Sequence, residues 1–191
     1  MQHHHSLFPV NLQAQWHKAE GVELEPSLLN WLLDANSLTA RLKSHCQQFR
    51  VQLLGQKVEP CHPKEANQDI YSGEEVLVRE VLLFCDDNPQ VFARSLIPLR
   101  SLTGNERQLA ELGEQSLGQV LFNSPNLFRK DIEIASFSDN STVFKFASTY
   151  VLPELKQLWG RRSVFMLGEK PLMVAEVFLP GAYAYSQESN Q

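Results

Sequence analysis

The fold is decided by residues 75–98, which read EVLVREVLLFC at 75–85, DDNP at 86–89 and QVFARSLIP at 90–98. The two outer segments are rich in Val, Leu, Ile and Phe, the residue types that favour β-strands. The Asp, Asn and Pro residues between them are typical of turns. Two strands joined by so short a turn run antiparallel. The sequence therefore predicts a β-hairpin over residues 75–98.

Further strands are predicted on both sides of this hairpin. A second hairpin is expected over residues 163–179, with its turn at 168–171. Alternating apolar residues predict shorter strands at 49–53 and 128–135. Residues 55–74 contain two prolines and few apolar residues, which predicts a loop. Because neighbouring strands are joined by tight turns, we expect a single antiparallel sheet.

Helices are predicted in blocks that are separate from the strands. Leucines at helical spacing predict a helix at 26–35 and a second helix after Ser37, with Leu38 facing inward. Two further helices are predicted at 105–112 and 116–123. The predicted class is therefore α+β, a single antiparallel β-sheet with helices clustered beside it.

Composition restricts the classes of function. The chain has 191 residues, with 17 Lys plus Arg against 22 Asp plus Glu, so its formal net charge is −5. This length suits a single domain over residues 1–191, and the acidity argues against nucleic-acid binding, which usually needs a basic face. No apolar run reaches the roughly 18 residues that a membrane-spanning helix needs. Residues 1–16 do not resemble a secretory signal, and the histidines at 3–5 carry no argument. We therefore expect a cytoplasmic protein without stable membrane insertion.

The cysteines do not indicate a disulfide framework or a metal site. Cys46, Cys61 and Cys85 are odd in number and form no CxxC motif, which predicts free thiols in a reducing compartment. His45 and His62 each adjoin a cysteine, but adjacent ligands of this kind match no standard zinc spacing.

Ionisable side chains stand inside the predicted strands. With a period of two, Arg79 shares a face with Val81 and Leu83, whereas Glu80 lies on the opposite face. Glu176 lies inside a second apolar strand. Buried charges cost several kcal/mol unless they are paired. The ordinary interpretation is a structural ion pair or a strand edge that faces water, and the alternative is a binding site for a charged ligand.

The expected register of the first hairpin adds a second cation to the face of Arg79. If residues 86–89 form a four-residue turn, Arg94 lies opposite Val81 and on the same face as Arg79. Two guanidinium groups on one apolar face suit a dicarboxylate ligand. A slip of one residue would remove Arg94 from this face.

Two further signals are weaker. The same reasoning in the last hairpin places Glu176 opposite Ser163 and next to Arg162, which favours a structural ion pair. Residues 116–118 begin a predicted helix, whose first backbone N–H groups can bind an anion, although every helix has such a start.

Short blocks along the chain carry a resemblance to a known family. The most specific are WGRRS at 159–163 and EVFLP at 176–180, and the others lie at 31–33, 37–39, 79–83, 112–113, 116–118, 121–122 and 131–134. In this order, over about residues 24–181, the blocks resemble those of the chorismate pyruvate-lyase family.

The resemblance implies an enzyme that converts chorismate to 4-hydroxybenzoate and pyruvate, the first committed step of ubiquinone biosynthesis, without cofactor or metal. It also implies helical flaps over a buried site, and inhibition by a product that is released slowly. The residues that it implies for substrate binding are Leu38, Arg79, Leu117 and Glu176. Arg79 would hold a carboxylate together with the Leu117 N–H, Glu176 would meet the ring hydroxyl, and Arg79 and Glu176 would be the catalytic pair. Arg94 would be available to the second carboxylate. We expect a monomer.

Two other functions stay open on the sequence. One is a small-anion sensor, because the same fold type serves as the effector domain of some transcription regulators. About 25 residues precede the first predicted helix, too few for a DNA-binding domain. The other is a carrier that delivers 4-hydroxybenzoate without catalysis.

One segment departs from the family's pattern. Residues 136–157 form a longer link than is usual between the flanking blocks, so we expect a surface insertion there. Within it, residues 142–146 alternate weakly as a strand does, and residues 153–158 are expected to begin a helix.

Overall fold

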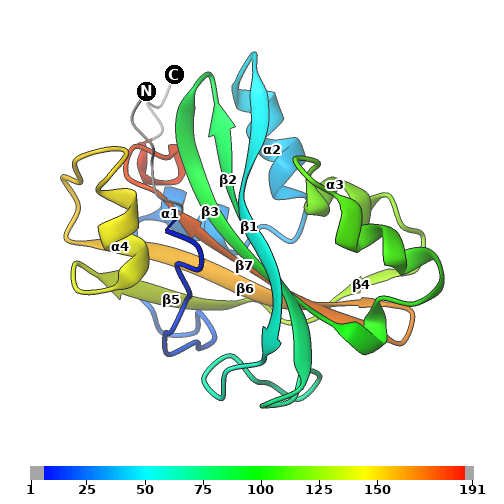
Figure 1. Ribbon diagram of the computed structural model, residues 1–191. Helices are drawn as coiled ribbons and strands as arrows, with labels where there is room; N and C mark the ends of the chain where they lie inside the picture. The colour runs from blue at the N-terminus through cyan, green and yellow to red at the C-terminus, as the bar shows by residue number, and fades with distance from the viewer. Residues whose placement is uncertain (1–6, 188–191) are drawn as a thin grey trace.

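The computed structural model describes residues 7–187, and the histidines at 3–5 lie outside this range. Seven antiparallel strands form one sheet in the order β1-β2-β3-β7-β6-β4, with β5 also paired to β6 (Figure 1). The strands are β1 (Phe49–Pro60), β2 (Glu75–Cys85), β3 (Asn88–Pro98), β4 (Leu127–Arg129), β5 (Glu133–Ser138), β6 (Gln157–Leu167) and β7 (Lys170–Phe178). The α-helices are α1 (Pro26–Leu32), α2 (Leu38–His45), α3 (Leu117–Phe122) and α4 (Thr142–Ala147). The 3₁₀ helices are η1 (Leu99–Ser101), η2 (Gly104–Glu111) and η3 (Tyr183–Tyr185).

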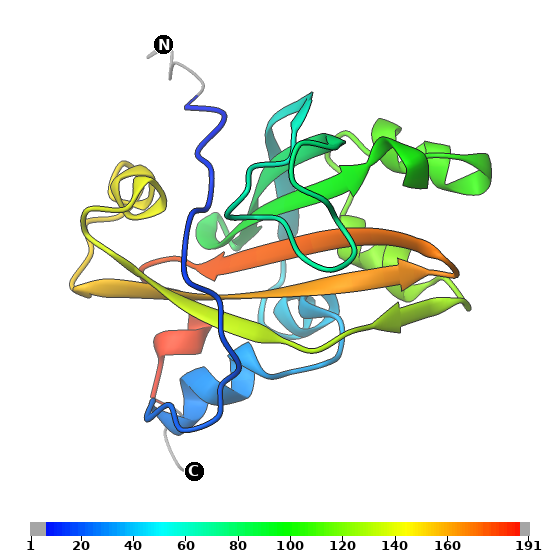
Figure 2. The same ribbon diagram turned by 90° about the horizontal axis from the view of Figure 1, so that it is seen from below.

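Apolar side chains cover both faces of the sheet. On the face of Arg79, the side chains of α1 and α2 pack against β2 and β3, and those of η2 and α3 pack beside them. On the opposite face, α4 and the segment around Val10 pack against Leu82 and Phe92. Figure 2 shows α1 and α2 on one side of the strands and α4 on the other. This arrangement confirms the predicted α+β class. None of the helices between residues 7 and 187 has the length and apolar character that spanning a bilayer requires.

The predicted register of the first hairpin is wrong. Its turn has two residues, Asp86 and Asp87. Both have positive φ (47° and 64°), as a type I′ hairpin turn requires. A bulge then leaves Gln90 as the extra residue of β3, because Leu83 pairs with Val91 and Phe84 with Pro89.

The shorter turn and the bulge together shift the register by one residue, which moves Arg94 to the other side of the sheet. Arg94 pairs with Glu80, not with Val81, so its side chain lies on the face opposite Arg79. The prediction that Arg94 is available to the substrate is therefore wrong.

The last hairpin is also shifted from the predicted register, with a different outcome. Its turn again has two residues, and Glu176 pairs with Arg161 in place of Ser163. Because the shift is two residues, Glu176 stays on its predicted face. Its cationic partner is Arg161, whereas Arg162 faces the other way and pairs with Glu133 at 2.7 Å.

The segment between β5 and β6 differs from its predicted local structure. Residues 142–147 form α4 and not a strand, and Phe144 and Phe146 are buried in the apolar core. Residues 153–156 are not helical, and Gln157 already begins β6. The atypical length of residues 136–157 stays a prediction.

Three other predicted elements also differ from the structure. The strand predicted at 128–135 is two short strands, β4 and β5, which pair with different parts of β6. The helix predicted at 105–112 is the 3₁₀ helix η2. The strand predicted at 49–53 continues through Pro60, into the segment that was expected to be a loop.

Arg94 is the centre of a buried ion cluster on the face opposite Arg79. Its guanidinium contacts Glu80 at 2.9 Å, Glu65 at 2.8 Å and Glu59 at 3.2 Å. Burial alone lowers the pKa of Arg94, but hydrogen bonding and charge interactions with these carboxylates raise it above its usual value. Glu80 also accepts hydrogen bonds from the backbone N–H groups of Val10 (2.7 Å) and Asn11 (2.9 Å). The cluster therefore joins the N-terminal segment and the loop after β1 to the middle of the sheet.

Replacing Arg94 is expected to destabilise the fold strongly. Arg94→Met leaves buried carboxylates without a counter-charge, which should lower the free energy of unfolding by about 3–5 kcal/mol. Urea denaturation followed by circular dichroism measures this loss. The matched control is Arg100→Met, because Arg100 pairs with Glu74 at an exposed position and should contribute less than about 1 kcal/mol. Equal losses in the two variants would contradict the account of the cluster.

Candidate active site

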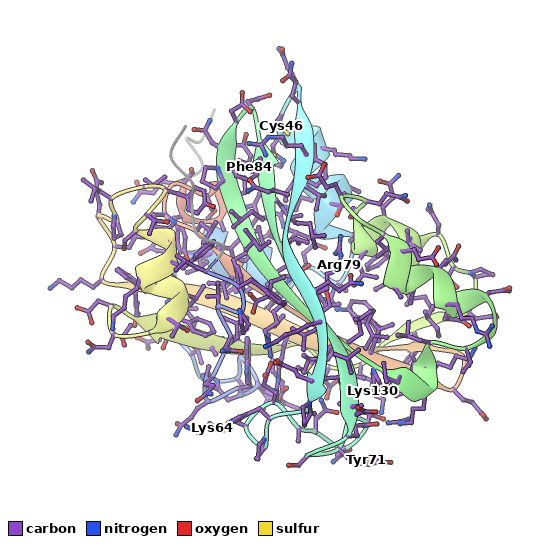
Figure 3. All side chains as sticks on the ribbon, in the orientation of Figure 1. Cys46, Lys64, Tyr71, Arg79, Phe84 and Lys130 are labelled. Carbon is purple, nitrogen blue, oxygen red and sulfur yellow. The ribbon has the colours of Figure 1, made fainter. Side chains whose placement is uncertain are left out.

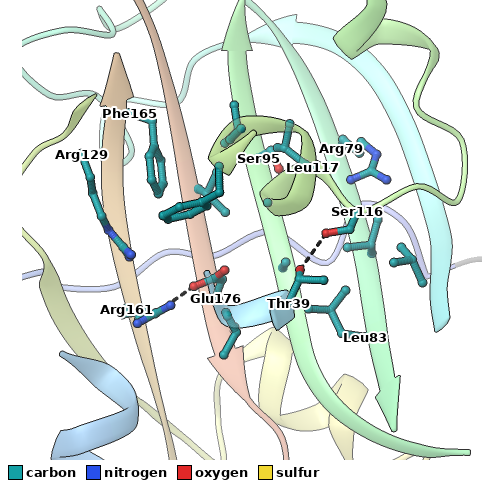
Figure 4. Close-up of a pocket in the computed structure, with 18 of the residues that line it drawn as sticks. Thr39, Arg79, Leu83, Ser95, Ser116, Leu117, Arg129, Arg161, Phe165 and Glu176 are labelled. Atoms are coloured by element: carbon teal, nitrogen blue, oxygen red, sulfur yellow. Dashed lines mark hydrogen bonds and ion pairs between the residues drawn. The ribbon is translucent and has the colours of Figure 1, made fainter. Parts of the chain in front are cut away.

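A pocket lies between the sheet and the helices α2 and α3 (Figure 4). Its cavity volume is about 40 Å³. Apolar side chains form most of its wall, among them Leu38, Val81, Leu117 and Phe165. The ionisable side chains of the wall are those of Arg79, Arg129, Arg161 and Glu176, so three positive charges and one negative charge leave the wall at +2.

Arg79 is a buried cation with no carboxylate partner among the described residues. It projects from the middle of β2 toward the helices α2 and α3, and only 1% of its surface is exposed (Figure 3). Its Nη2 donates to the carbonyl oxygens of Gly113 (2.9 Å) and Gln115 (2.8 Å), which fixes the direction of the guanidinium. Its Nε is buried and has no hydrogen-bond partner. Burial lowers the pKa of Arg79 to about 10, so a bound anion would relieve an unfavourable charge.

Glu176 and Arg161 form an ion pair on adjacent strands. Arg161 Nε donates to Glu176 Oε2 at 2.8 Å, and Arg161 Nη1 donates to the carbonyl oxygens of Trp31 (3.1 Å) and Asp34 (2.6 Å). These bonds tie the turn between α1 and α2 to the sheet. Within the part of the chain that the structure describes, Glu176 Oε1 has no hydrogen-bond partner. This oxygen is therefore free to accept a hydrogen bond from a ligand.

Arg129 reaches the pocket from the end of β4. Its Nε donates to Ser163 Oγ at 2.9 Å and its Nη1 to the carbonyl oxygen of Ala35 at 3.2 Å, and its guanidinium lies 4.9 Å from the ring centre of Phe165. Burial, together with the nearby charge of Arg161, lowers the pKa of Arg129 to about 10. Arg129 is thus a second cation that this pocket holds without a paired carboxylate.

Two helices cover the pocket and contact each other above it. Ser37 caps α2 and Ser116 caps α3, each through a side-chain oxygen that accepts a backbone N–H. The hydroxyl groups of Thr39 and Ser116 share a hydrogen bond of 2.7 Å, which joins the starts of the two helices.

The structure brings four of the predicted site residues together and leaves out one. Leu38, Arg79, Leu117 and Glu176 all line the pocket, whereas Arg94 lies on the other face of the sheet. Sequence reasoning missed Arg129 and Arg161. Arg161 could have been found from the sequence, because a two-residue turn in the last hairpin places Arg161 opposite Glu176. Arg129 gave no clear signal, because its strand has only three residues.

The described residues contain no cluster of side chains placed to hold a metal ion. No group of three or more His, Cys, Asp or Glu side chains between residues 7 and 187 is placed to hold a metal ion. Cys46, Cys61 and Cys85 are free thiols, and Cys61 and Cys85 are buried.

Known proteins resemble this chain over most of its length. The family model described as chorismate lyase matches residues 10–190. A probable chorismate pyruvate-lyase of Psychromonas ingrahamii is 44% identical over 160 residues, which cover 83% of this chain and 86% of the relative. A probable chorismate pyruvate-lyase of Idiomarina loihiensis is 38% identical over 192 residues, which cover 96% and 94%.

Among solved structures, similarity extends to a different group of proteins. PhnF from Mycobacterium smegmatis matches with a TM-score of 0.55 and 14% identity, over 77% of this chain and 65% of that one. The effector domain of PhnF alone matches with a TM-score of 0.54 and 13% identity, over 77% and 90%. At this identity the likeness concerns the fold alone. The match of the family model over nearly the whole chain and the identity to curated relatives show that the chain belongs to the chorismate lyase family.

Proposed function

We propose that this protein is a lyase that converts chorismate to 4-hydroxybenzoate and pyruvate, the first committed step of ubiquinone biosynthesis. The observation that carries the proposal is the presence of Arg79, a buried cation without a carboxylate partner, in one apolar pocket with Glu176. Chorismate is a ring that bears two carboxylates, and the wall of the pocket carries a formal charge of +2. The curated relatives named above support the same activity.

Arg79 and Glu176 bind opposite ends of the ring in this proposal. Arg79 holds the ring carboxylate through the guanidinium nitrogens that its two backbone bonds leave available. The Leu117 N–H, which starts α3 and has no bonding partner among residues 7–187, donates to the same carboxylate. Glu176 Oε1 accepts a hydrogen bond from the ring hydroxyl, and Leu38 packs over the ring from α2.

The chemistry requires positioning more than reactive groups. The ether bond from the ring to the enolpyruvyl group breaks with its electrons going to oxygen, and the adjacent ring carbon loses its hydrogen as a proton. The ring becomes aromatic, and the enolpyruvyl fragment takes up one proton to give pyruvate, so atoms and electrons balance without an oxidant. The protein has to hold the side chain axial to the ring and stabilise the departing negative charge.

Two routes remain for the proton that leaves the ring. It passes either to Glu176 or directly to the methylene carbon of the departing enolpyruvyl group. The ion pair with Arg161 holds Glu176 in one orientation, which suits a hydrogen-bond acceptor for the hydroxyl. We favour the orienting role for Glu176.

The alternatives are a sensor or carrier that binds 4-hydroxybenzoate or another small anion without changing it. The similarity to PhnF concerns the fold, and it is too distant to carry a ligand or a role over to this chain. In our proposal the enzyme acts as a monomer in the cytoplasm, where it binds chorismate and releases 4-hydroxybenzoate.

Ultraviolet spectroscopy of chorismate mixed with the protein tests the proposal. We expect 4-hydroxybenzoate to form in large molar excess over the protein, which only a lyase achieves. Arg79→Met should lower kcat/KM and the affinity for 4-hydroxybenzoate by about 10- to 100-fold each, because it removes a charge-assisted hydrogen bond to the carboxylate. Binding of 4-hydroxybenzoate without turnover of chorismate would support a sensor or carrier instead.

Glu176→Gln distinguishes the two roles of the carboxylate. If Glu176 only orients the hydroxyl, the amide retains an acceptor, and kcat should fall by about 10-fold or less. Loss of a general base typically costs about 10² to 10⁴ in rate, so a decrease of that size would show proton transfer to Glu176. Thermal unfolding and 4-hydroxybenzoate affinity serve as controls, because the variant leaves Arg161 without its carboxylate.

The hydrogen bond between Thr39 and Ser116 is expected to slow product release. Thr39→Val keeps the shape of the side chain and removes this bond, so the dissociation rate of 4-hydroxybenzoate should rise by about 2- to 10-fold in stopped-flow displacement. Inhibition by added product should weaken in parallel. The control is Lys43→Met, which removes the exposed bond from Lys43 to Gln119 and should change the rate by less than about 2-fold. An unchanged rate in Thr39→Val would show that this contact does not limit release.

A further inference from the structure

We propose that Arg129 binds the second carboxylate of chorismate, the one on the enolpyruvyl group. The inference rests on the proposed lyase function and adds a substrate-binding residue to it. It is carried by the charge balance of Arg129, by its place in the pocket, and by the shape of the substrate.

Arg129 differs from most buried arginines of the fold because it forms no ion pair with a carboxylate in the described chain. Among the arginines that are at least partly buried between residues 7 and 187, Arg41, Arg94, Arg161 and Arg162 each form an ion pair with a carboxylate. The remaining members of this group are Arg79 and Arg129, and both line the same pocket. Two cations without paired carboxylates in one pocket match a ligand with two carboxylates.

The positions of Arg79 and Arg129 in the pocket indicate which carboxylate of the substrate each one binds. Figure 4 shows Arg79 at one side of the pocket, and Arg129 with Arg161 at the other, where Glu176 also lies. In chorismate the ring hydroxyl is opposite the ring carboxylate, and the enolpyruvyl ether is on the carbon next to the hydroxyl. A ring with its carboxylate on Arg79 and its hydroxyl at Glu176 therefore directs the enolpyruvyl group toward the side of Arg129.

The other cation on this side of the pocket already has a counter-charge. Arg161 is paired with Glu176 and donates to backbone carbonyl oxygens, and its Nη2 has no hydrogen-bond partner among the described residues. Arg94 lies beyond the sheet. Arg129 uses Nε and Nη1 for Ser163 and Ala35, and its Nη2 has no hydrogen-bond partner in the described part of the chain. These contacts hold the guanidinium in place and leave one nitrogen for a ligand, which is the arrangement of a preorganised site.

This placement gives Arg129 a role that changes during the reaction. When the ether bond breaks, negative charge grows on the enolpyruvyl fragment beside a guanidinium that forms no ion pair with the described residues, so the charge is stabilised. The product 4-hydroxybenzoate retains only the ring carboxylate. Arg129 therefore contacts chorismate and pyruvate but not 4-hydroxybenzoate, and its removal should separate substrate binding from product binding.

The test compares Arg129→Gln with Arg79→Met in two assays. Glutamine retains a donor for the local contacts and removes the charge, so kcat/KM for chorismate should fall by about 10- to 100-fold. The dissociation constant of 4-hydroxybenzoate, measured by calorimetry, should stay within about 2-fold of wild type. Arg79→Met should weaken both. Arg129→Lys restores the charge and should recover part of kcat/KM, and it serves as the test variant if the glutamine variant does not fold.

The outcomes separate the inference from the function on which it rests. Wild-type kcat/KM in Arg129→Gln, or a parallel loss of 4-hydroxybenzoate affinity, overturns the assignment of Arg129 while the lyase function stands. In the second case Arg129 would support the pocket as a whole and not the enolpyruvyl carboxylate. Absence of turnover by the wild-type protein overturns the proposed function itself.

Discussion

A guanidinium group that is buried in a protein needs a counter-charge, and this requirement divides the arginines of the sheet into two groups. Arg94 meets it with Glu59, Glu65 and Glu80 on one face, where the resulting cluster joins the loop after β1 and the N-terminal segment to the strands. Arg79 does not meet it within the described chain, and the fold directs it into a pocket. The same chemical group thus stabilises the fold on one face and creates a binding site on the other, depending on where its carboxylates are.

Much of this division was predictable from the sequence, because strand periodicity alone places Arg79, Glu80 and Glu176 on their faces. The position of Arg94 was not, because it depends on a turn and on a bulge beside it. Asp86 and Asp87 adopt positive φ, which aspartate tolerates, so the turn is two residues shorter than predicted. The bulge leaves Gln90 as an extra residue of β3, and the net one-residue shift places Arg94 on the opposite face. The last hairpin has no bulge, so its two-residue shift leaves Glu176 on its predicted face.

Other parts of the structure depend on tertiary contacts that no local pattern reveals. Residues 142–147 have the apolar content of either a strand or a short helix, and the place for Phe144 and Phe146 in the core favours the helix. Arg129 belongs to a three-residue strand whose only support is β6, so its approach to the pocket follows from that pairing. The formal charge of −5 argues against nucleic acid as a partner, but it does not reveal that the wall of the pocket carries +2. A few cations in an apolar wall, where water screens them less, decide what the pocket binds.

Arg79 and Arg129 each bind one carboxylate of the substrate in this proposal. A crystal structure with an unreactive analogue of chorismate that retains both carboxylates would test it. We expect the ring carboxylate within about 3.2 Å of the Arg79 guanidinium and the enolpyruvyl carboxylate within the same distance of Arg129. An enolpyruvyl carboxylate that faces solvent or binds elsewhere, while Arg129 retains its contacts with Ser163, Ala35 and Asp34, would contradict the proposal.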